Sequence, residues 1–312
     1  MNRRLFLAGL LGFAASCAGL GTAYATAVEP FRQRITRYAF TPRGWPKGLR
    51  LRVALLADFH AHPRFLGPDE IDRIVARTNA LEPDLVLGLG DYGSQERETV
   101  PPETVARHLL GLKARYGTYF IQGNHDLTDD LDLQRRGSGM SKTEVAFREA
   151  GLNLLESDAV ALDIPGRPLW LAGLPSEYTI RRGEPLRRSG YRSQRRTHNA
   201  DTMARALDKV PAGAPVLLMA HEPDVFALDL DPRVVLQVSG HTHGGQIRLM
   251  GWSPFIPSRY GLRYAYGHIQ ESGRDLVVSA GLGSQCLLGR PIRIGAVPEI
   301  VLLELGGAPA AA

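Results

Sequence analysis

The segment Val234-Val-Leu-Gln-Val-Ser-Gly-His-Thr-His-Gly-Gly245 is a mostly apolar run that ends in two histidines held between glycines. An apolar run without alternation is typical of a strand buried on both faces of a parallel sheet. Because His241 and His243 stand two residues apart in a glycine-rich loop, their imidazoles can reach two different metal ions. We therefore predict a strand over Val234–Gly240 with two candidate metal ligands at its carboxyl end.

Four further groups of polar residues stand directly after short apolar runs, in the same way as His241. They are Asp58 with His60 after Leu51–Ala57, Asp91 after Leu85–Gly90, Asn124 with His125 and Asp126 after Tyr119–Gly123, and His221 after Val216–Ala220. In open α/β sheets, ligands bind at the carboxyl ends of the strands. We therefore expect the five groups to converge on one site.

The remaining periodicity predicts an α/β fold with two packed β-sheets flanked by helices. The first half alternates strands with helices, a rhythm typical of parallel crossovers: strands over Leu51–Ala57, Asp84–Gly90 and Thr118–Gly123, and helices over Asp69–Leu81, Pro102–Arg115 and Ser141–Ala150. The second half is richer in strands, with a helix over Asn199–Leu207. Its expected strands are Asn153–Glu156, Ala159–Ile164, Leu169–Leu174, Val216–His221, Val234–Gly240, Gln246–Leu249, Gly267–Glu271, Leu276–Ala280 and Ile300–Leu305.

Aspartate, histidine and asparagine side chains are borderline ligands that suit Mn, Fe or Zn. We predict two divalent ions: one held by Asp58, His60 and His243, a second held by Asn124, His221 and His241, with Asp91 placed to bridge them. Such ions, about 3.5–4 Å apart, clamp the attacking and leaving oxygens of a displacement at phosphorus. A water bridging both ions would be acidified to hydroxide near neutral pH and act as the nucleophile.

His125 stands beside a predicted ligand but has a different expected role. It can donate a proton to the leaving-group oxygen or to an oxygen on phosphorus, and Asp126 can orient and charge its imidazole. The alternative is that His125 only packs the loop. We predict that His125 and Asp126 are catalytic.

These blocks, taken in order, carry a family resemblance. Asp58-x-His60, Gly90-Asp91, Gly123-Asn-His-Asp126, His221 and Gly240-His-x-His243 are similar to the motifs of the calcineurin-like metallophosphoesterase superfamily. The resemblance covers roughly residues 50–306 and implies a four-layer α/β/β/α fold. Gly240-His-Thr-His-Gly-Gly-Gln246, Val278-Ser-Ala-Gly-Leu-Gly283, Pro291-Ile-Arg293 and Pro298-Glu-Ile300 resemble a bacterial branch of membrane-associated or twin-arginine-exported phosphodiesterases, related to enzymes that cleave lipid-A precursor pyrophosphates.

Three positions of the sequence differ from the patterns of other phosphoesterase branches, which narrows the class of enzyme that the chain resembles. Ser94 stands where purple acid phosphatases have Tyr, and Asp126 where Ser/Thr protein phosphatases have Glu. His125 stands where the lipid-A pyrophosphatases have Arg. The resemblance thus implies a dinuclear phosphoesterase acting on phosphodiesters, with lipid or cell-envelope substrates. Two alternatives stay open: a phosphomonoesterase, and a catalytically silent exported protein that binds metal or lipid.

The N-terminus has the pattern of an export signal. Arg3-Arg4-Leu5-Phe6-Leu7 precedes a stretch without charge up to Val28, and Ala23-Tyr24-Ala25 offers a cleavage site. This pattern resembles a twin-arginine signal, which places the protein in the periplasm or on the outer face of the cytoplasmic membrane. Retention as an anchor and lipidation at Cys17 are the alternatives. We divide the chain into a signal (1–25), a lead-in (26–49), one catalytic domain (50–306) and a tail (307–312).

The net charge and a cluster of arginines indicate which partners the protein binds. The net charge of +5 falls to +3 without Arg3 and Arg4, which is too small to indicate a stable nucleic-acid partner. Eight arginines between Arg181 and Arg205 either bind an anionic membrane surface or form a solvated loop. The expected substrate is a phosphoester such as a phospholipid or a nucleotide-linked lipid.

Two further interpretations stay open. Gln246 either touches substrate or orients His243. The aromatic residues of the second half either line one wall of the cleft or pack in the second sheet; they are Trp252, Phe255, Tyr260, Tyr264 and Tyr266.

Overall fold

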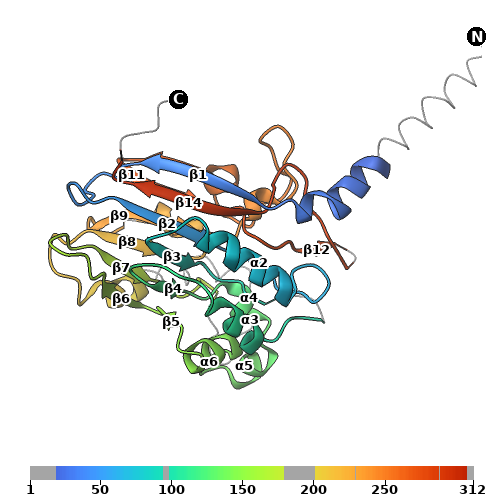
Figure 1. Cartoon of the computed structure of the whole chain (residues 1–312), viewed down its shortest axis with the longest axis horizontal. Coiled ribbons are helices and arrows are strands. Elements are labelled where there is room, and N and C mark those ends of the chain that lie inside the picture. The colour runs from blue at the N-terminus through green and yellow to red at the C-terminus, as the bar shows by residue number, and fades with distance from the viewer. Residues whose placement is uncertain (1–18, 94–97, 179–200, 229, 288, 308–312) are drawn as a thin grey trace, which may run out of the picture.

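Two six-stranded sheets pack face to face, with helices on the outer face of each (Figure 1). The computed structural model describes residues 19–93, 98–178, 201–228, 230–287 and 289–307. The predicted α/β fold with two sheets flanked by helices is confirmed. Most of the expected signal segment, including Arg3 and Arg4, lies outside the described residues.

The first sheet has the strand order β1-β14-β2-β3-β4-β5. Strands β2 to β5 run parallel, and β14 is antiparallel to β2 and parallel to β1. The strands are β1 (Arg34–Phe40), β2 (Leu51–Leu56), β3 (Leu85–Gly88), β4 (Thr118–Phe120), β5 (Asn153–Leu154) and β14 (Glu299–Leu305).

The second sheet has the order β10-β11-β9-β8-β7-β6. Its four inner strands are parallel, and its two outer strands run antiparallel to their neighbours. The strands are β6 (Asp158–Ala161), β7 (Trp170–Gly173), β8 (Val216–Met219), β9 (Val234–Ser239), β10 (Gly267–Glu271) and β11 (Arg274–Val278). A separate hairpin joins β12 (Cys286–Leu287) to β13 (Arg290–Pro291).

Helices cover the outer faces of the sheets. The first sheet carries α2 (Pro68–Asn79), α3 (Pro102–Leu109) and α6 (Lys142–Glu149), and the second carries residues 201–207 with η2 (Pro223–Ala227). Ser141 caps α6, because its side chain accepts a hydrogen bond from the Glu144 amide. The shorter helical elements are η1 (Glu29–Phe31), α4 (Asn124–Thr128), α5 (Leu131–Arg136), η3 (His243–Gly245) and η4 (Gly261–Tyr264).

Strand β2 shows how one apolar run serves two layers. Val53 and Leu55 belong to the core between the two sheets, whereas Ala54 and Leu56 belong to the core under the helices. Successive side chains of a strand point to opposite faces, so a strand buried on both faces must be apolar throughout. The continuous apolar runs of the sequence therefore reflect the position of these strands in the middle of four layers.

Four elements differ from the sequence prediction. Strand β1 lies inside the expected lead-in, where its half-exposed pattern gave no apolar run. Helices α4 and α5 follow the predicted strand β4 directly. The predicted strand Gln246–Leu249 is wrong: Gln246 has a φ of +51°, and the segment forms only isolated bridges through Ile247 and Leu249.

Replacing Phe147 with Ala tests the packing of α6 on the first sheet. The Phe147 ring is fully buried, with its centroid 4.5 Å from that of Tyr92 and 5.5 Å from that of Phe120. We expect Phe147→Ala to lower the free energy of unfolding by about 3–5 kcal/mol, because it leaves a cavity. Urea denaturation measures the loss. Leu110→Ala, at a position 51% exposed, is the control; equal costs for both variants would contradict the assigned packing.

Candidate metal centre

The polar groups predicted from the strand ends lie together at one edge of both sheets. Asp58 follows β2 and Asp91 follows β3, whereas His221 follows β8 and His241 follows β9. Because these strands are parallel within each sheet, their carboxyl ends meet at the same edge. Asn124 opens α4 at the same edge, directly after β4.

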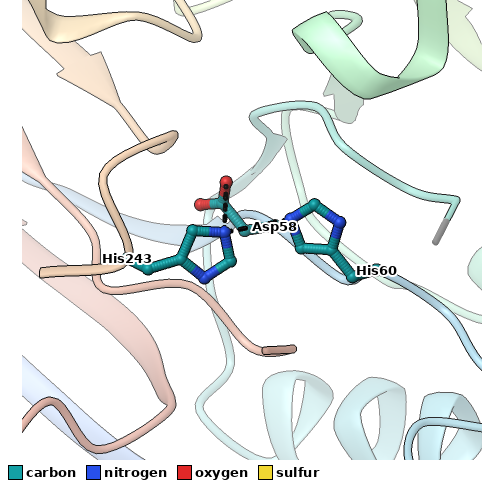
Figure 2. Close-up of side chains that lie close together, drawn as sticks. All are labelled: Asp58, His60 and His243. Carbon is teal, nitrogen blue, oxygen red and sulfur yellow. Dashed lines mark hydrogen bonds and ion pairs between the residues drawn. The ribbon is translucent and has the colours of Figure 1, made fainter. Parts of the chain in front are cut away.

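The first cluster contains Asp58, His60 and His243, whose side chains point toward one another (Figure 2). Their candidate ligand atoms all lie within 4.8 Å of one another. His60 Nε2 lies 3.0 Å from His243 Nε2, which lies 3.7 Å from Asp58 Oδ1. The three buried side chains are therefore arranged to hold one cation.

The second cluster contains Asp91, His221 and His241 and meets the same criterion. His221 Nε2 lies 3.2 Å from Asp91 Oδ2 and 3.2 Å from Asn124 Oδ1. The same Asp91 oxygen lies 3.7 Å from His60 Nε2 of the first cluster. One carboxylate thus reaches both clusters, as expected for a bridging ligand.

Neighbouring groups fix the orientation of three of these imidazoles. His221 Nδ1 donates to the Leu89 carbonyl at 2.6 Å, and His241 Nε2 donates to the Pro257 carbonyl at 2.9 Å. Arg293, which is fully buried, donates to His243 Nδ1 at 3.0 Å. By donating through one ring nitrogen, His221 and His241 leave the other for a metal, the arrangement that metal-binding histidines use. The Arg293 contact instead holds the His243 ring in position.

The protonation states also suit metal binding. Burial lowers the pKa of His60 to about 4 and that of His241 to about 3, so both rings are neutral near pH 7. Burial raises the pKa of Asp58 to about 7. A bound divalent cation would reverse that upward shift, because it stabilises the ionised carboxylate. The protonation states of these buried ligands therefore fit a site that holds two divalent ions.

Backbone strain is concentrated at these ligands. Ten described residues other than glycine have a positive φ, and five of them are predicted metal ligands: Asp58 (+51°), His60 (+41°), Asp91 (+58°), His241 (+70°) and His243 (+51°). Such conformations cost free energy for residues with a Cβ and are found where function requires them. Gly240 permits the approach of Asp58, since a Cβ there would lie 2.6 Å from Asp58 Oδ2.

Asp126 has a different role from the predicted one. Its carboxylate accepts hydrogen bonds from the backbone amides of Asp91, Tyr92 and Gly123 at 2.8–3.0 Å, and so ties two ligand-bearing loops together. Asp129 occupies the place expected for Asp126, with its Oδ2 3.1 Å from His125 Nδ1. The backbone turns into α4 at Asn124, which directs Asp126 inward and places Asp129 one helical turn after His125.

The remaining candidates have structural contacts. The Gln246 side chain donates to the Gln285 carbonyl and accepts from its amide, so it joins two loops. Tyr264 packs against Phe226 and Tyr266 bonds to Glu299, whereas Trp252 and Phe255 are exposed. Most of the arginine-rich cluster, residues 181–200, lies outside the described part of the chain.

Sequence reasoning missed two residues of this site, Asp129 and Arg293. The i, i+4 spacing of His125 and Asp129 would have indicated their contact had a helix been expected at that position. Arg293 comes from the loop after β13, 50 residues away from His243 along the chain. No spacing in the sequence indicates that contact.

Replacing Asp91 with Asn tests the bridging position. The amide keeps the shape of the side chain but removes the negative charge that both clusters share, so we expect metal affinity to fall by about 100-fold or more. The bound metal per chain, measured by mass spectrometry after dialysis, should fall below two. Asp132→Asn, on exposed α5, should retain two ions. Two ions retained in the Asp91 variant would contradict the bridging role.

Comparison with known proteins agrees with this geometry. A family model described as calcineurin-like phosphoesterase matches residues 51–245. The uncharacterized metallophosphoesterase YkuE of Bacillus subtilis is 29% identical over 310 residues, which is 98% of each chain. Phosphodiesterase YaeI of Escherichia coli is 27% identical over 316 residues, 98% of this chain and 99% of its own.

A third relative is longer than this chain. A bovine transmembrane protein with a metallophosphoesterase domain is 27% identical over 272 residues, which cover 83% of this chain and 54% of its own length. The matched residues 51–245 include both metal-binding clusters. The chain belongs to the calcineurin-like metallophosphoesterase family.

Proposed function

We propose that this metallophosphoesterase hydrolyses phosphodiesters outside the cytoplasm, with lipid or other cell-envelope phosphodiesters as its substrates. The observation that carries the proposal is the pair of buried clusters that share Asp91 Oδ2, next to the His125–Asp129 contact. The name of the full-length relative YaeI, a phosphodiesterase, supports the choice of diesters. The twin-arginine pattern supports export.

Two divalent ions bound in these clusters would supply an activated water and neutralise charge on the phosphoryl oxygens. The protein's own contribution is rigid placement. Strand ends, the amide contacts of Asp126 and the strained ligand loops hold the ligands before substrate arrives. Such preorganisation means that little reorganisation is needed when charge develops in the transition state.

His125 acts as the general acid in this proposal. Burial lowers the pKa of His125, but the carboxylates of Asp91 and Asp129 raise it more, so the net shift is upward. Its ring lies next to His60, with 5.3 Å between the ring centroids, and is 10% exposed. Nδ1 donates to Asp129 at 3.1 Å, and Nε2 is the ring nitrogen that protonates the leaving oxygen in this proposal. An alkoxide leaving group needs that proton, since it is a strong base.

Two features of the amino-acid sequence support the proposed membrane association. The uncharged stretch Leu5–Val28 is long enough to act as an anchor, and the arginines from Arg181 onward suit anionic headgroups. Within the described ranges, no helix is long and apolar enough to cross a membrane.

Substrate class is tested with the purified chain loaded with Mn²⁺. We expect kcat/KM for bis-p-nitrophenyl phosphate to exceed that for p-nitrophenyl phosphate by about tenfold, equivalent to about 1.4 kcal/mol of transition-state stabilisation. Release of p-nitrophenol measures both rates. Faster monoester cleavage would identify a phosphomonoesterase instead. No turnover with two metals bound would favour the catalytically silent binding protein.

Replacing Asp129 with Asn tests the general acid. Without the carboxylate, the pKa of His125 falls, so the alkaline limb of the kcat profile should move to lower pH. We expect kcat to fall by about 10–100-fold for a dialkyl phosphodiester, whose leaving group is an alkoxide, and less for bis-p-nitrophenyl phosphate, whose leaving group is p-nitrophenolate. Asp132→Asn on α5 is the matched control. An unchanged alkaline limb would show that Asp129 does not act through His125.

A further inference from the structure

A tight turn beside the metal centre carries an unusual residue at its tip. Leu249 and Trp252 exchange two backbone hydrogen bonds, of 2.8 and 3.0 Å, and so enclose a two-residue turn. Both residues of this turn have positive φ values, +50° for Met250 and +86° for Gly251. Turns of this kind favour Asn, Asp or Gly, because a larger side chain is strained there. Met250 therefore costs free energy in its backbone conformation.

Nothing in the described structure offsets that cost. The Met250 side chain is fully exposed, and those of Leu249 and Trp252 are 54% and 58% exposed. Three large, exposed apolar side chains therefore stand on one short turn, a feature typical of an interaction site. An apolar environment around the turn would bury these three side chains.

The turn is also connected to the metal centre. Phe255, three residues after the turn and 71% exposed, lines a cavity of about 100 Å³ together with His243 of the first cluster. Ile247 and Pro254, on either side of the turn, line the same cavity. The turn therefore joins two segments that line a cavity, and a metal ligand lines the same cavity.

A second apolar element lies at the same end of the molecule. Leu20, Tyr24 and Val28 recur every four residues along helical residues 19–27 and the turn after them, and are 36–73% exposed. The Arg293 amide donates to the Ala25 carbonyl, and the next residue, Ile294, bridges Ile247. The helix and residues 246–248, which lead into the turn, thus lie on either side of residues 293–294.

Two arginines in the segments around the turn remain for an anionic partner. Residues 246–266 and 282–298 contain five arginines and no Asp or Glu. Arg259 pairs with Glu177 and Asp224, Arg263 pairs with Glu271 and Arg293 is fully buried, whereas Arg248 is half-buried and Arg290 is exposed. Residues 19–33 contain a single acid, Glu29, which is 3% exposed. An apolar tip with basic side chains in the adjoining segments complements the acyl boundary and the anionic headgroups of a lipid surface.

We propose that the turn Leu249–Trp252 inserts into the headgroup–acyl boundary of an anionic bilayer and sets the cavity mouth at the lipid surface. Trp252 lies at the depth that tryptophan prefers at membrane interfaces. Docking itself needs no catalysis. Only the consequence, that a phosphate carried by a lipid enters from the bilayer side, rests on the proposed function.

The test uses the fluorescence of Trp252 in the full chain. The chain has three tryptophans; Trp45 is 8% exposed and Trp170 belongs to strand β7. With vesicles of phosphatidylglycerol and phosphatidylcholine whose acyl chains carry bromine, we expect strong quenching of the wild type. Quenching should be at least threefold weaker in Trp252→Phe, which keeps the other two tryptophans. Because the wild type and Trp252→Phe share the same apolar N-terminal stretch, the difference in quenching between them reports on Trp252 even when that stretch binds vesicles.

Met250→Asn separates docking from folding. Asparagine suits the positive φ, so this variant should melt at an equal or higher temperature, while quenching of Trp252 falls at least twofold. Its turnover of bis-p-nitrophenyl phosphate should match that of the wild type, so a loss of docking is distinguishable from a failure of the proposed function. Leu131→Asn, at an exposed site on α5, is the control and should leave quenching unchanged.

Two outcomes would overturn the proposal. Equal quenching in the wild type and Trp252→Phe would mean that the turn does not enter the bilayer, and would leave the surface to a protein partner. Unchanged quenching in Met250→Asn would mean that the strained tip contributes nothing to docking.

Discussion

The structure depends on one electrostatic constraint, the burial of two carboxylates, Asp58 and Asp91, at the junction of two sheets. Buried charge of one sign is costly unless opposite charge lies in contact with it. Imidazoles surround both carboxylates, yet burial keeps His60 and His241 neutral. Burial also lowers the pKa of His221, but Asp91 raises it more, so this ring contributes positive charge. Divalent cations bound in the two clusters would supply the rest. Much of the nearby structure, including the buried Arg293, then serves to hold the ligands of those cations.

The two sheets also hold the strained backbone of the ligand-bearing residues in place. Ligand-bearing residues adopt left-handed backbone conformations that would not persist in a loose loop. Each follows a strand buried on both faces, so the strained residue is attached to a rigid element. Asp126 adds to this rigidity by accepting three backbone amides from two of the loops. The strained residues, the rigid strands that carry them and the buried carboxylates therefore all lie at the same edge of the two sheets.

The surroundings of the centre are asymmetric. On one side lie His125, the proton donor of the proposed function, and Asp129, whose carboxylate contacts its ring. On the side of His243 lie a cavity and the exposed turn around Met250, with Arg248 shortly before the turn in the chain. A substrate with a phosphodiester between a polar group and an apolar group would match both sides. Diester hydrolysis and bilayer docking, the two proposed properties of the protein, rest on these separate sides.

The sequence alone determined the layered fold and the residues that gather at the metal centre. Unbroken apolar runs can only be strands buried on both faces, and polar residues at the ends of parallel strands must meet at one edge. Contacts that depend on side-chain direction were decided by the tertiary structure. The sequence indicated Asp126 as the partner of His125, but α4 directs Asp126 inward and brings Asp129 to the imidazole instead. Likewise, Arg293 meets His243 only through the packing of distant loops, and the exposure of Met250 becomes evident only when the turn closes.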